Sequence, residues 1–185
     1  MSINLLETVQ QQLGYPAIKK IDPNNEKPAV HEFAQAAVPT VLIALHRYVQ
    51  SDEGATDFLS GNRTNWADVI FEDHKQQAVE MVAGYAGRST EDTTSEINRI
   101  AQQTVTIVKQ RLPDASIKSL KAFFQDQSKT ILLYLPPEIH AGDALNDAEL
   151  DDKTNKMEGP ISSLIKSIGN AFSSPVTKED VQQKL

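Results

Sequence analysis

The chain has 185 residues, of which 39% are hydrophobic, and a formal net charge of −7 at pH 7. This length fits one domain or two small ones, and the acidic balance argues against a nucleic-acid partner, because nucleic-acid binders present basic surfaces. The chain contains no cysteine, which excludes disulfide frameworks, thiolate zinc sites and cysteine nucleophiles.

The N-terminal third has the pattern of helices separated by glycine and proline. Apolar residues at helical spacing predict a helix over residues 3–13, and Gly14 suits its C-terminal end. A proline-containing linker follows. The segment from 28 to 50 predicts a long helix in which Pro39 either introduces a kink or begins a second helix. Ser51 then fits the N-cap of a short helix that ends near Gly61.

The central part continues this helical pattern. Residues 65–87 show helical spacing, and we expect Trp66 to be a core anchor at the helix start. Thr93 and Glu96 form a capping-box pattern that predicts the start of the next helix. Asp114 is the predicted N-cap of a further helix, and no segment has a convincing strand pattern.

Short similarities indicate an internal repeat. The similar pairs are residues 7–14 with 80–87, and residues 34–45 with 101–112. They predict two related helical units, 1–61 and 65–137, that share one core, because about 60 residues alone make a marginal domain. The predicted fold class is therefore all-α. It is a compact bundle of about seven or eight helices over residues 1–137, followed by an acidic connector, 138–158.

The connector allows three interpretations. The first is a calcium loop, since the carboxylates of Asp147, Glu149, Asp151 and Glu158 match oxygen-ligand positions of an EF-hand, although Asp152 stands where the sharp turn needs glycine. The second is acid–base catalysis by paired carboxylates, which the polar surroundings disfavour. The third, which we prefer, is a polar hinge.

The residues after this hinge predict an amphipathic helix over 159–173, in which Gly159 is the N-cap and Pro160 the first helical residue. Its apolar stripe consists of Ile161, Leu164, Ile165, Ile168 and Phe172. This stripe either packs back on the bundle or forms a contact face for a partner. Residues 174–185 form a polar tail.

Catalytic motifs are lacking. The four histidines are scattered and expected at surface or boundary positions, and Glu72, Asp73 and His74 would point apart on a helix. The sequence therefore predicts a non-enzymatic protein with no catalytic, metal-binding or cofactor-binding residues assigned. No run approaches the roughly 20 apolar residues that cross a bilayer, and the N-terminus lacks the features of a signal peptide. We expect a cytoplasmic protein.

Several of these segments resemble a known family. The opening "LLETVQQQLG", the alanine-rich "AQAAVPTVLIAL", the later "AVEMVAGYAG" and the acidic "LDD" are similar to the YidB-like family of uncharacterised bacterial proteins. The resemblance covers roughly residues 3–155 and implies an all-helical domain. It implies no activity and no catalytic residues.

The sequence thus favours an interaction module whose partner is another protein or a second copy. Its contact face would be the stripe from Ile161 to Phe172. The alternative function is binding of a small ligand or a divalent cation such as calcium by the 147–158 segment.

Overall fold

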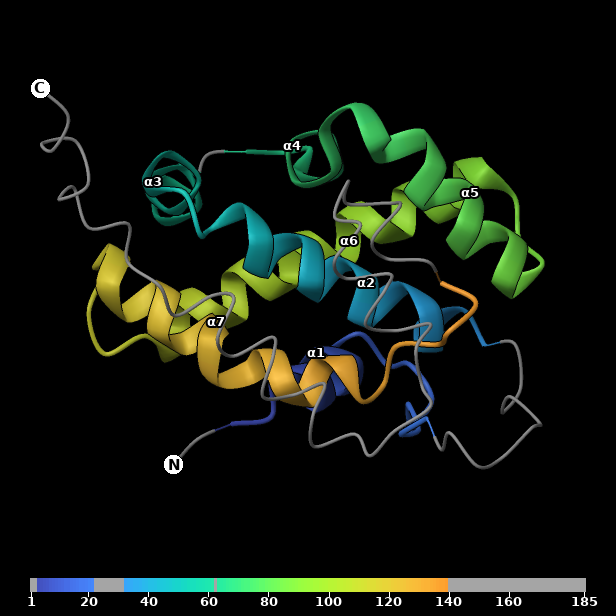
Figure 1. Cartoon of the computed structure of the whole chain (residues 1–185), viewed down its shortest axis with the longest axis horizontal. Coiled ribbons are helices and arrows are strands. Elements are labelled where there is room, and N and C mark those ends of the chain that lie inside the picture. Colours follow the sequence, from blue (N-terminus) through green and yellow to red (C-terminus); the bar gives the residue numbers. More distant parts are fainter. Residues whose placement is uncertain (1–2, 22–31, 62, 140–185) are drawn as a thin grey trace, which may run out of the picture.

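The computed structural model describes residues 3–21, 32–61 and 63–139 (Figure 1). Its elements are α1 (Leu5–Gln12), α2 (Phe33–Tyr48), α3 (Asp52–Ser60), α4 (Trp66–Phe71), the 3-10 helix η1 (Glu72–His74), α5 (Lys75–Ala86), α6 (Thr90–Arg111) and α7 (Ile117–Leu132). None of the described residues lies in a strand. The prediction of a compact all-α bundle is therefore confirmed for this part of the chain.

The core is built around α2. Every residue of this helix from Phe33 to His46 is buried, without a polar side facing solvent. A helix that is buried on all sides must be covered by several neighbours, and α2 packs against α1, α4, α5, α6 and α7. In Figure 1, α2 accordingly runs through the middle of the bundle.

Pro39 lies inside α2, which is one continuous helix. Of the two predicted alternatives, a new helix starting at Pro39 is therefore wrong. Proline has no N–H group, so the carbonyl of Gln35 lacks its usual helical donor. The hydroxyl of Thr40 donates to the carbonyl of Ala36 at 2.8 Å within the same turn.

Glycine ends three helices as predicted, at Gly14, Gly61 and Gly87. Gly14 has φ of +70°, and the N–H of Tyr15 bonds back to the carbonyl of Gln10 at 3.0 Å. Gly87 ends α5 in the same way, with Arg88 bonding to Ala83 at 3.0 Å. The ends at Gly14 and Gly87 are Schellman motifs, in which the left-handed residue turns the chain out of the helix.

Two predicted N-caps are wrong. α6 begins one turn earlier than expected, because Ser89 Oγ accepts from the N–H of Asp92 at 3.1 Å, and Thr93 lies buried inside the first turns. α7 is capped by Ser116, whose hydroxyl accepts from Ser119 N at 3.1 Å. Asp114 instead accepts from Ser116 N, at 3.0 Å, and so stabilises the preceding turn.

The segment 65–87, predicted as one helical stretch, is divided into α4, η1 and α5. The break occurs at Glu72, which has φ of 49° and ψ of −127°. This conformation is uncommon for a residue with a side chain and costs on the order of 1–3 kcal/mol. The break redirects the chain between α4 and α5.

A buried glutamine holds the N-terminal segment to the bundle. The side chain of Gln35 accepts from Lys19 N and donates to Lys19 O, both at 2.9 Å, and it donates to the carbonyl of Tyr134 at 2.7 Å. The N–H of Ile21 donates to Leu133 O at 2.8 Å. One side chain of α2 therefore joins the chain before α2 to the chain after α7.

The predicted segments after the bundle lie outside the described residues. They are the remainder of the acidic connector, the amphipathic helix over 159–173 and the tail. The proposed repeat of 1–61 and 65–137 stays a prediction.

Candidate functional site

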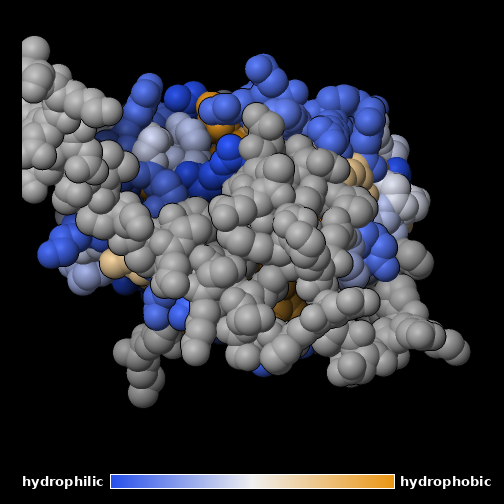
Figure 2. All heavy atoms as spheres, in the orientation of Figure 1, coloured by the Kyte–Doolittle hydropathy of each residue, from blue (hydrophilic) through white to orange (hydrophobic). Residues whose placement is uncertain are grey.

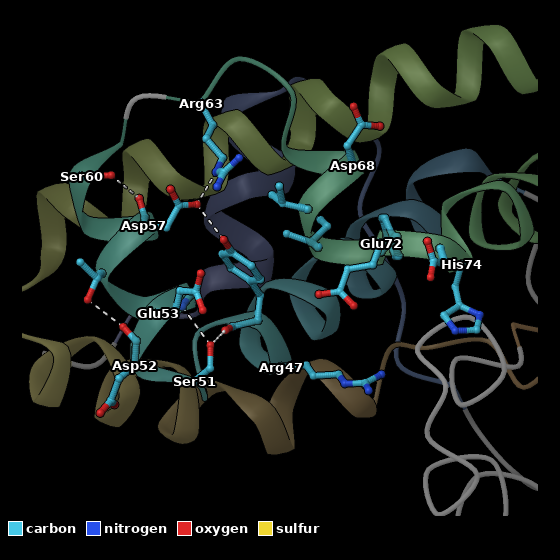
Figure 3. Close-up of a pocket in the computed structure, with 17 residues that line it drawn as sticks. Arg47, Ser51, Asp52, Glu53, Asp57, Ser60, Arg63, Asp68, Glu72 and His74 are labelled. Carbon is cyan, nitrogen blue, oxygen red and sulfur yellow. Dashed lines mark hydrogen bonds and ion pairs between the residues drawn. The ribbon is translucent and has the colours of Figure 1, made fainter.

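An open cleft of about 1170 Å³ lies between the α2–α3 corner and the α4–η1 junction (Figure 3). One wall consists of Arg47 and Tyr48 at the end of α2 together with residues of α3. The other wall consists of residues 68–74. The cleft therefore joins segments that are separated in sequence by the loop after Gly61.

The α2–α3 corner is fixed by a close backbone approach. The N–H of Gly54 donates to Ser51 Oγ at 2.9 Å, which confirms Ser51 as the N-cap of α3. A Cβ atom on Gly54 would lie 2.1 Å from the carbonyl oxygen of Tyr48. Only glycine lets α3 start this close to the end of α2.

Trp66 anchors the opposite wall and is 1% exposed, which confirms it as a core residue at a helix start. Its ring packs against Tyr48 edge-to-face, with centroids 6.3 Å apart, and against Phe58 at 5.8 Å. The first turn of α4 is also held from α6, because Asn98 Oδ1 accepts from Ala67 N at 2.9 Å. The two walls are thus attached to one rigid aromatic base.

A three-residue cluster occupies the α3 wall. Asp57 accepts from the hydroxyl of Tyr48 at 2.7 Å and forms an ion pair with Arg63. Burial opposes ionisation of Asp57, but the hydrogen bonds from Arg63 and Tyr48 outweigh it and hold the pKa of Asp57 below its ordinary value. Burial and the adjacent carboxylate raise the pKa of Tyr48 to about 12. Tyr48 therefore keeps its proton and acts as a donor.

The charge of the cleft is unevenly compensated. Its six carboxylates belong to Asp52, Glu53, Asp57, Asp68, Glu72 and Asp73. Asp57 pairs with Arg63, Asp68 with Lys75, and Asp52 with Lys121 at 2.7 Å.

The other three carboxylates, those of Glu53, Glu72 and Asp73, form no ion pair with any residue that the structure describes. Glu72 points back toward the α2–α3 side, where Arg47 lies (Figure 3). The excess charge of the cleft is therefore negative.

Glu72, Asp73 and His74, which were expected to point apart on a helix, form the 3-10 helix η1 and all line the cleft. The side chains of Glu72 and His74 point in different directions (Figure 3). The arrangement still carries no metal-site geometry. Within residues 3–21, 32–61 and 63–139, no group of three or more histidine, aspartate or glutamate side chains could hold a metal ion.

His46 corrects the expectation of surface or boundary histidines. It is 5% exposed, with its ring stacked on Phe124 of α7 at 6.3 Å. Burial lowers the pKa of His46 to about 4, against a smaller opposing effect of a hydrogen bond with the side chain of Gln125. The imidazole is therefore neutral at pH 7, and it belongs to the core and not to the cleft.

The other predicted site residues are not reached by the structure. The contact stripe Ile161, Leu164, Ile165, Ile168 and Phe172 and the 147–158 carboxylates lie outside the described residues. The cleft was not predictable from local sequence patterns, because neither the acidic start of α3 nor the segment 71–74 indicates that both line one cleft. The only local signal was the density of acids in each segment.

Comparison with known proteins gives no relative. The chain matches no family model, no curated protein and no solved structure. The resemblance to the YidB-like family therefore stays a prediction. In the described part of the chain, no helix combines the length and apolar character needed to cross a membrane.

Proposed function

We propose that the protein is a non-enzymatic, cytoplasmic interaction module, and that the cleft contacts a basic segment of a protein partner. The observation that carries this proposal is the charge of the cleft. Three carboxylates, those of Glu53, Glu72 and Asp73, lack a cationic partner among the described residues. Lysine or arginine side chains of a bound segment would supply the missing charge.

The backbones of the two walls are held together by packing, which supports such a role. The Gly54 corner joins α3 closely to the end of α2, and Trp66 packs α4 against Tyr48 and Phe58. On binding, the partner segment then loses conformational entropy, while the backbone of the cleft loses little. The largely hydrophilic surface of the described residues on the face shown in Figure 2 fits contacts made through charge.

The test is selection from a randomised peptide library followed by fluorescence anisotropy. We expect the selected peptides to be rich in lysine and arginine. In the variant that combines Glu53→Gln, Glu72→Gln and Asp73→Asn, their affinity should fall about tenfold, which corresponds to about 1.4 kcal/mol. The difference in affinity between the wild type and this variant should become smaller at high salt, since exposed charges are screened.

The matched control carries Glu7→Gln, Glu91→Gln and Glu138→Gln. These three residues are exposed and do not line the cleft, and the variant has the same net charge as the cleft variant. It should bind the selected peptides like the wild type. An equal loss in both variants would show a general charge effect, and peptides without basic bias would contradict the proposal.

A second contact surface is proposed from the sequence pattern alone, namely the apolar stripe from Ile161 to Phe172. We expect a partner to be retained from a native lysate by the full chain and not by a chain that ends at Glu158. Retention of the same proteins by both would assign the stripe to internal packing. If the shorter chain also loses the basic peptides, the two surfaces act together.

The calcium alternative for residues 147–158 has a direct test of its own. Titration calorimetry with millimolar Ca²⁺ should show no binding heat if the segment is a hinge, as we propose.

A further inference from the structure

We draw no further inference here: the strongest candidate, a cation site formed by the carboxylates of Glu53, Glu72 and Asp73 at the α3–η1 cleft, belongs to the site already described, and no second observation in the described residues points to a ligand.

Discussion

At the residue scale, Gly54 decides whether the cleft keeps its shape. The Cβ atom of Gly54→Ala would lie 2.1 Å from the backbone oxygen of Tyr48, and a backbone group cannot rotate away as a side chain does. We expect the substitution to reduce the free energy of unfolding by about 1–3 kcal/mol. The urea midpoint of unfolding measures this loss.

Gly84 is the matched control for Gly54. It also lies within a helix, but a Cβ atom there would meet nothing within 4 Å. Gly84→Ala should therefore stabilise the protein, by up to about 1 kcal/mol, because alanine loses less backbone freedom in a helix. Equal stability of the Gly54→Ala protein and the wild type would refute the close approach.

Glu72 shows what residue patterns could not predict. Its positive-φ conformation has no signal in the sequence, because glutamate is a good helix former and the flanking apolar residues keep helical spacing. The break there depends on how α4 and α5 pack against α6 and α2. The cleft follows from the break, so the cleft was equally beyond the reach of local patterns.

At the element scale, mutations can distinguish the two candidate N-cap residues of α6, Ser89 and Thr93. Ser89→Ala should cost about 1 kcal/mol of stability, because it removes the acceptor of the Asp92 N–H. Thr93→Val should be neutral or stabilising, because the Thr93 hydroxyl is buried and has no partner among the described residues. Thermal unfolding of both variants measures the difference.

The opposite order of stabilities would restore Thr93 as the cap. The sequence favoured Thr93 because the pattern Thr93-x-x-Glu96 is a complete capping box. Ser89 and Asp92 form a similar pattern one turn earlier, and the hydroxyl of Ser89 donates to the carboxylate of Asp92 at 2.8 Å. Packing decides between two neighbouring N-cap patterns such as these. Thr93 is fully buried within the helix, and Ser89 caps it.

Most elements were nevertheless predictable. The helices expected over residues 3–13 and 28–50, and those expected to start near Thr93 and Asp114, are present as α1, α2, α6 and α7, and the glycine signals at 14, 61 and 87 mark helix ends. These features are local, because each depends on one helix having a face to bury or an end to close. Contacts between distant segments, such as the Gln35 bonds to Lys19 and Tyr134, have no such local pattern.

At the scale of the whole molecule, acid should weaken the fold through His46. The pKa of His46 is about 4 in the folded protein and 6.5 as its ordinary value. The unfolded chain therefore binds the proton first. Stability falls as the pH drops from about 6.5 to about 4, by about 3 kcal/mol in total, and this effect is complete below the folded pKa.

The His46→Asn variant isolates this contribution. Carboxylates with lowered pKa values, such as those of Asp57 and Glu96, also lose their stabilising effect in acid, but they do so in both proteins. Urea unfolding at a series of pH values should show a steeper decline for the wild type between pH 6.5 and 4. If the free energy of unfolding depended on pH in the same way in both proteins, His46 would titrate normally in the folded state.

The enclosure of α2 has an evolutionary consequence. Residues 33–46 have no solvent-facing position at which sequence drift is tolerated, whereas loops and outer helix faces change freely. Among descendants of a common ancestor, this window should keep its side-chain volumes longest, including its small residues Ala34, Ala36, Ala37 and Ala44. Aligned homologues should therefore show fewer changes of side-chain volume in residues 33–46 than in the outer helices and loops.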